Sequence, residues 1–173
     1  MLSFVNWPKS LQALLGFLLA SSPAFFLVSP AMALTATGNF TSQIIIAANC
    51  SVGSTNTLNF NTQGVLSANV DATTTFAVTC TSSTPYNVGL DAGTTAGGTT
   101  TTRLMVNGAN TVSYKMYSDS GRATNWGNTV GTDTVAGTGT GAAQTLTIYG
   151  RVPVQTTPAP ATYTDLVTIT VTY

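Results

Sequence analysis

Few residues in this sequence have side chains that could carry out chemistry. Histidine and glutamate are absent, the five acidic residues are all aspartates, and the only cysteines are Cys50 and Cys80. A hydrolytic triad needs an imidazole or another base, and a zinc site needs histidines or several cysteines. The aspartates are scattered through turn-like segments, where aspartate is an ordinary residue. We therefore expect no catalytic, metal-binding or cofactor-binding residues; a glycosidase-like aspartate pair is the remaining enzymatic alternative.

Three further features could indicate catalysis or ligand binding, but each has a simpler structural interpretation. The glycines of residues 137–141 superficially resemble a nucleotide loop, yet a strand-like segment follows them rather than a helix. We expect a flexible hairpin loop there. Lys115 lies within an alternating segment and is expected to be an outward-facing, solubilising charge. Trp126 and the tyrosines could line a sugar-binding surface, but packing in a small β-protein is the favoured interpretation.

The N-terminus has the features of a secretory signal peptide. Lys9 precedes an apolar run over residues 11–20, and residues 31–33 (AMA) provide the small residues that signal peptidase accepts. The alternative is a membrane anchor, because apolar residues resume at 24–28, but residues 21–23 (SSP) interrupt the run and no strong charge cluster flanks it. We expect a leader over residues 1–33 and a mature domain over residues 34–173 that does not insert into a membrane.

The two cysteines both lie in the expected mature chain. In an oxidising compartment an isolated pair is most simply a disulfide, so we predict a Cys50–Cys80 bridge. A loop of this length would contribute roughly 3–4 kcal/mol in the chain-entropy description. Two buried free thiols are the alternative.

The composition and the apolar pattern both predict an antiparallel β-sandwich. Only 6% of the residues are charged, against about 25% in typical globular proteins, and the net charge is zero. There is thus no overall electrostatic footprint for nucleic acid or anionic lipid. Apolar residues alternate with polar ones along several short segments separated by glycine- and asparagine-containing turns, and no capped helical period is present. The alternating segments are 76–80, 86–90, 112–116, 145–149 and 167–173; the turns are 91–93, 107–108, 120–121 and 131–141.

A series of motifs occurs in the order found in one family. The motifs are residues 37–40 (TGNF), 50–52 (CSV), 74–80 (TTFAVTC), 86–93 (YNVGLDAG), 103–105 (RLM), 113–117 (SYKMY), 126–127 (WG), 137–141 (GTGTG), 149–153 (YGRVP) and 163–173 (YTDLVTITVTY). Together they resemble the spore coat protein U domains, which include the subunits of archaic, Csu-type chaperone–usher pili. No single motif is decisive, but the ordered set is specific and spans nearly the whole mature chain.

The resemblance implies an all-β, incomplete immunoglobulin-like antiparallel β-sandwich that is completed by a donor strand. A periplasmic chaperone would fill the gap first, and the N-terminal extension of a neighbouring identical or homologous subunit would then replace it. An outer-membrane usher would assemble the subunits into a fibre at the cell surface. Alternate residues of the terminal strand would border the acceptor groove: Val167, Ile169, Val171 and Tyr173.

The segment after the leader is suited to such a donor role. One face of an extended chain would carry bulky and small residues in alternation: Leu34, Ala36, Gly38, Phe40, Ser42, Ile44 and Ile46. We expect residues 34–46 to form this donor arm. The alternative is that residues 40–46 form the domain's own first strand.

The predicted function is that of a structural subunit of a secreted surface pilus or fibre, and not that of an enzyme. Its partners would be neighbouring subunits, the chaperone and the usher, with no nucleic acid. A spore or cyst coat protein and a surface adhesin module of the same fold are the alternatives.

The leader assignment predicts export with cleavage after Ala33. N-terminal sequencing or intact mass of periplasmic protein should give a chain that begins at Leu34, because the small residues before that position fit the peptidase. Persistent membrane-embedded precursor in a secretion-competent host would contradict this prediction.

Overall fold

The computed structural model describes residues 32–173, so most of the predicted leader (residues 1–33) lies outside the described residues. Residues 44–173 form a compact unit separate from the residues before it, and all strands of the described chain lie in this second unit. Among the described residues no helix is long and apolar enough to span a bilayer.

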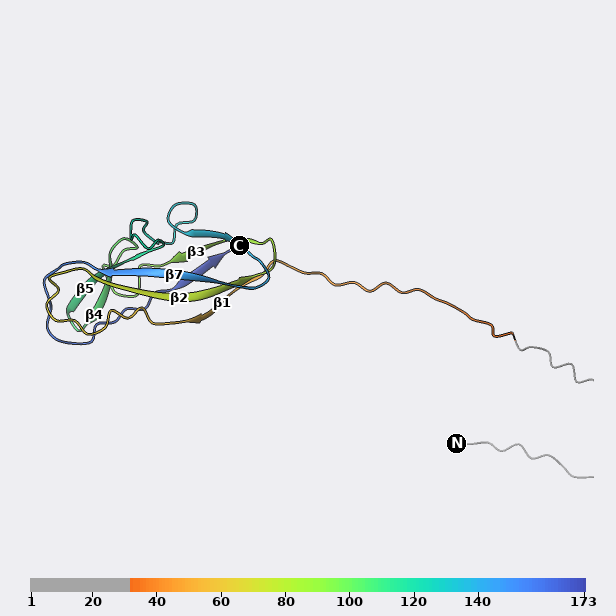
Figure 1. Ribbon diagram of the computed structural model, residues 1–173, viewed down its shortest axis with the longest axis horizontal. Helices are drawn as coiled ribbons and strands as arrows, with labels where there is room; N and C mark the ends of the chain where they lie inside the picture. Colours follow the sequence, from red (N-terminus) through yellow and green to blue (C-terminus); the bar gives the residue numbers. More distant parts are fainter. Residues whose placement is uncertain (1–31) are drawn as a thin grey trace, which may run out of the picture. The chain divides into compact units, whose positions relative to one another are not determined.

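Eight antiparallel strands make up the second unit (Figure 1). They are β1 (Cys50–Thr55), β2 (Val70–Cys80), β3 (Pro85–Leu90), β4 (Arg103–Asn107), β5 (Asn110–Tyr117), β6 (Val135–Thr138), β7 (Ala143–Val152) and β8 (Ile169–Thr172). The larger sheet has the order β1-β2-β7-β5-β4, and the smaller has the order β6-β3-β8. The predicted all-β, antiparallel fold is therefore confirmed.

The core forms where alternate residues of the strands face inward. The fully or nearly buried apolar side chains come from β2, β3, β5, β7 and the segments between strands: Phe60, Leu66, Phe76, Val78, Cys80, Tyr86, Val88, Leu90, Val112, Tyr114, Met116, Trp126, Ile148 and Val152. Trp126 is 1% exposed and donates its indole N–H to the carbonyl oxygen of Val88 at 2.8 Å, so it belongs to the core as expected. Lys115 is half-buried and alternates with buried neighbours, which places it on the outer face as predicted.

The segment 131–141 differs from its prediction as a turn and hairpin loop. Residues 135–138 form β6, which pairs with β3, whereas the following strand β7 pairs with β2 and β5 in the other sheet. The glycines at 139 and 141 therefore lie in a connection between sheets and not in a hairpin. The strand lacks clear alternation because Gly137 lies against the ring of Tyr86, where a Cβ atom would collide with the phenol.

The predicted disulfide is present and joins the first strand to the second. Cys50 and Cys80 are register partners in β1 and β2, with an S–S distance of 2.02 Å and a Cα–Cα distance of 4.1 Å. Because β1 pairs with no other strand in the described chain, the bridge reinforces a strand that only one ladder holds.

Arg103 is a buried charge that the sequence did not single out as structural. Its side chain is completely buried, and its guanidinium donates to four backbone carbonyl oxygens at 2.6–2.8 Å. The acceptors belong to Leu90, Asp91, Thr100 and Trp126. Burial lowers the pKa of this guanidinium, but arginine remains charged in proteins. Arg103 thus links the end of β3, the 94–102 loop and the Trp126 segment through one planar fork.

We predict that Arg103→Lys destabilises the fold by about 2–4 kcal/mol, because an ammonium cannot reach four carbonyls held around a planar fork. Denaturant unfolding of the purified mature protein, followed by the fluorescence of Trp126, measures this change. Arg151→Lys, at an exposed ion pair, is the matched control and should cost less than about 1 kcal/mol. Equal effects of the two substitutions would contradict the structural role of Arg103.

Candidate functional site: an open groove between two strand edges

The edge strand β1 of the larger sheet and the edge strand β8 of the smaller sheet each have one unpaired side. β1 pairs only with β2, and β8 pairs only with β3, among the strands that the structure describes. The end of β8 approaches the beginning of β1, where the Tyr173 hydroxyl and the Asn49 side-chain oxygen are 3.4 Å apart. Unpaired strand edges carry free N–H and C=O groups that can bind another strand.

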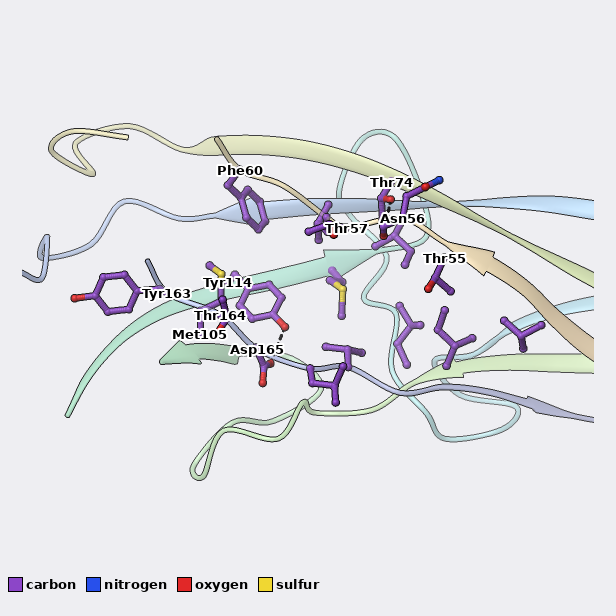
Figure 2. Close-up of a pocket in the computed structure, with 18 residues that line it drawn as sticks. Thr55, Asn56, Thr57, Phe60, Thr74, Met105, Tyr114, Tyr163, Thr164 and Asp165 are labelled. Atoms are coloured by element: carbon purple, nitrogen blue, oxygen red, sulfur yellow. Dashed lines mark hydrogen bonds between the residues drawn. The ribbon is translucent and has the colours of Figure 1, made fainter. Parts of the chain in front are cut away.

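A cavity of about 520 Å³ lies between these edges (Figure 2). One wall consists of β1 and the segment that follows it, the floor comes from β3, β5 and β7, and the other wall is the chain that leads into β8. The apolar lining residues are Val52, Leu58, Phe60, Leu90, Met105, Tyr114, Met116, Ile148, Tyr163, Leu166, Val167 and Ile169. The groove is therefore a part of the hydrophobic core that remains open on one side.

The apolar walls are incompletely covered. Val52 is 40% exposed and Leu166 is 69% exposed, although the floor residues Leu90 and Met116 are almost fully buried. Phe60 packs edge-on against Tyr114, with ring centroids 6.2 Å apart, and narrows one end of the groove. Exposed apolar surface beside unpaired backbone is typical of an interaction site.

A polar cluster borders the same groove. The Tyr114 hydroxyl donates to Asp165 Oδ2 at 2.7 Å (Figure 2), while Asp165 Oδ1 accepts the backbone N–H of Thr94 and Thr95 at 3.0 and 3.3 Å. Burial, together with this bond to a carboxylate, raises the pKa of Tyr114 far above its ordinary value. The phenol therefore stays neutral, and the cluster serves to hold the 94–95 loop against the groove wall.

The terminal strand is shorter than the alternation of residues 167–173 predicted. β8 covers Ile169–Thr172, since the backbone of Thr168 is occupied by Asp91: its N–H donates to the carboxylate at 2.9 Å and its C=O accepts the Asp91 N–H at 3.1 Å. Val167 and Ile169 line the groove, and Val171 packs against the core. Tyr173 lies outside the strand and is 57% exposed.

The predicted donor arm lies in no strand. Residues 32–49 have no regular secondary structure, and β1 begins at Cys50, so residues 40–46 are not the domain's own first strand in this structure. The bulky arm side chains are strongly exposed: Leu34 97%, Phe40 91%, Ile44 81%, Ile45 82% and Ile46 72%. Ala36, Gly38 and Ser42 are exposed as well.

Sequence reasoning missed the floor of the groove and the wall at residues 56–60. Leu58 and Phe60 stand in a polar, non-alternating stretch, so no strand pattern identifies them. The sequence feature that could have identified Leu58 and Phe60 is that they are the apolar residues of a stretch otherwise made of asparagines and threonines.

These features define a class of protein: an antiparallel β-sandwich with an open apolar groove between two unpaired strand edges. The sequence profile of the Spore Coat Protein U domain matches residues 36–170, so the chain belongs to the Spore Coat Protein U domain family. A comparison with curated proteins found no match.

Among solved structures, the fold is similar to a chain in the crystal structure of the CsuC–CsuE chaperone–tip adhesion subunit pre-assembly complex from archaic chaperone-usher Csu pili of Acinetobacter baumannii. The TM-score is 0.53 and the sequence identity is 22%. The match covers 74% of this chain but only 40% of that chain.

We predict that replacing both cysteines by serine lowers the stability of the domain by roughly 3–4 kcal/mol, because the 30-residue loop loses its closure and the β1 edge its covalent anchor. Denaturant unfolding measures the loss, and mass spectrometry after alkylation checks that the wild type has no free thiol. Unchanged stability, or two alkylatable thiols in native wild-type protein, would contradict the structural role of the bridge.

Proposed function

We propose that this chain is a structural subunit of a surface pilus or fibre, in which the donor arm of one copy lies in the groove of the next. The observation that carries the proposal is the coexistence, in one chain, of an unfilled apolar groove between two open strand edges and an exposed, unpaired apolar segment. The groove lacks a strand and apolar side chains to fill it, and the exposed segment lacks a sheet with which to pair.

The backbone of the arm suits the gap. An extended strand placed between β1 and β8 would pair with both free edges and join the two sheets. Thirteen residues span about 43 Å at about 3.3 Å each, whereas the six residues of β1 span about 20 Å. The arm is thus long enough to follow the groove along its whole length.

The side chains of the arm suit the groove as well. In an extended chain, Phe40, Ile44 and Ile46 share one face with the smaller Gly38 and Ser42. Full burial of a large apolar side chain contributes about 1.5–3 kcal/mol, so several such residues can offset the entropy lost when the arm becomes ordered.

An unfilled subunit also needs a temporary partner. Its open edges and apolar walls would otherwise promote aggregation. We infer that a periplasmic chaperone covers the groove until an outer-membrane usher adds the subunit to the fibre. The family membership and the likeness to a chain of a chaperone–subunit complex support these partners and a route through the periplasm to the cell surface.

Phe40→Asp tests the donor role most directly. We expect the variant to be secreted, to form its disulfide and to bind the chaperone, yet to yield few or no heat-resistant, high-molecular-weight fibres. An unpaired carboxylate in an apolar groove costs several kcal/mol, whereas the same charge on the exposed arm costs little. Electrophoresis of unboiled samples, after co-expression with the cognate chaperone and usher, measures fibre formation.

Thr41→Asp is the matched control. It adds the same charge one residue further on, on the opposite face of the extended arm, and should leave fibre formation near the wild-type level. Normal fibres from Phe40→Asp subunits would overturn the donor assignment. Loss of the soluble chaperone complex would instead indicate that Phe40 belongs to the domain's own fold.

A further inference from the structure

The outer face of the larger sheet gathers nearly all the accessible positive charge of the described chain. Residues 32–173 contain four basic residues; one, Arg103, is fully buried, and the other three lie together on or beside β5 and β7. Lys115 and Arg151 are register partners, and Arg122 reaches the same strands from the loop after β5, where it donates to the Gly150 carbonyl at 3.1 Å. We name Lys115, Arg122, Arg151, Tyr117 and Tyr149 the cation–tyrosine face.

The side chains of this face are held in place by the sheet. Tyr117 and Tyr149 are also register partners, so both tyrosines stand beside the cations on the outer surface. The guanidinium carbon of Arg122 lies 5.9 Å from the centroid of the Tyr149 ring. Arg122 adopts a positive φ of 56°, a left-handed conformation that non-glycine residues rarely adopt and that surrounding contacts must hold.

One carboxylate is not enough to neutralise the cations. Asp71 accepts two hydrogen bonds from Arg151, at 2.7 and 2.8 Å, and lies 3.3 Å from Arg122. It is the only acidic residue with an ion pair to the face within residues 32–173, and Lys115 has no ion-pair partner there. Three cations therefore face one anion, and the face retains a local positive charge in a chain whose net charge is zero.

A second copy of the chain is a poor partner for this charge. Each of the other four aspartates already accepts hydrogen bonds from backbone N–H groups of its own chain: Asp91 from Gly93 and Thr168, Asp119 from Ala123 and Thr124, Asp133 from Thr129, and Asp165 from Thr94 and Thr95. These bonds fix the four carboxylates in loops of their own chain, which favours a different molecule as the source of the complementary anions.

The shape of the surface indicates an extended ligand. The face lies on a sheet and continues along β2 and β7 as a row of threonines, Thr73, Thr75 and Thr147, that are neighbours of Tyr149 in the ladder. Hydroxyls in a row can bond to an extended polar chain, guanidinium groups bind carboxylates, and tyrosine offers both an apolar ring and a polar tip. We propose that the cation–tyrosine face binds an acidic polysaccharide, with its carboxylates at Lys115 and Arg151 and its sugar rings against the tyrosines, while the largely buried Arg122 adds to the positive potential.

Binding of the purified mature protein to polygalacturonate, compared with the same polymer methyl-esterified, tests the proposal. We expect binding to the acid form that weakens as salt rises, and little binding to the neutral ester. Lys115→Gln should lower the affinity roughly two- to five-fold, in line with one exposed charge pair. It should leave folding and fibre formation unchanged, so the result is independent of the proposed fibre role.

A charge-matched variant distinguishes binding at the cation–tyrosine face from nonspecific electrostatic attraction to the protein as a whole. Lys115→Gln combined with Ala109→Lys restores the net charge but moves the cation six residues, or about 20 Å, to the exposed turn between β4 and β5, away from the threonine row and well beyond the screening length of about 10 Å. We expect its affinity to stay as low as that of Lys115→Gln. Recovery to the wild-type affinity, equal binding of the esterified polymer, equal binding of a DNA oligonucleotide, or preference for anionic vesicles over polygalacturonate would each overturn the proposal.

Discussion

The central constraint on this structure is an uncovered strip between β1 and β8, where unpaired backbone and apolar core side chains are exposed in the described part of the chain. Buried peptide groups must form hydrogen bonds, and apolar surface next to them tends to leave water. An open strip of this kind therefore costs the isolated domain stability and favours the binding of a complementary strand. The groove thus consists of backbone edges and core side chains, which are the groups that the proposed strand addition uses.

The strands beside the gap are held by contacts from one side only, and the structure reinforces each of them. The Cys50–Cys80 bridge fastens β1 to β2. Asp91 accepts a hydrogen bond from the backbone N–H of Thr168, just before β8. Burial raises the pKa of the Asp91 carboxyl, but its hydrogen bonds lower that pKa by more, so the net shift is downward. Arg103 joins the loops behind the groove through four carbonyls. The few ionisable residues of the chain serve largely to fix loops and edges around an incomplete core.

Alternation predicted the strands whose two faces meet different surroundings, as β2, β5 and β7 do, with the core on one side and solvent on the other. It failed for β6, where Gly137 is required by the Tyr86 ring, and for Leu58 and Phe60, which reach the core from an irregular segment. The arm and the terminal strand could be proposed as site elements because each is local. The floor could not, because Leu90, Met116 and Ile148 come together only through pairings between distant strands.

The sequence by itself determined the all-β class, the disulfide, the family resemblance and the poverty of reactive groups, because these follow from residue types, local periodicity and motif order. Only the tertiary structure decided which edges stay open, how the groove is lined and which residues become partners across the sheets. A net charge of zero also concealed the cluster of Lys115, Arg122 and Arg151, because a sum over the chain does not record position. Long-range strand pairing decides these features, because a pattern that repeats every two residues assigns side chains to faces but does not distinguish registers that differ by two residues.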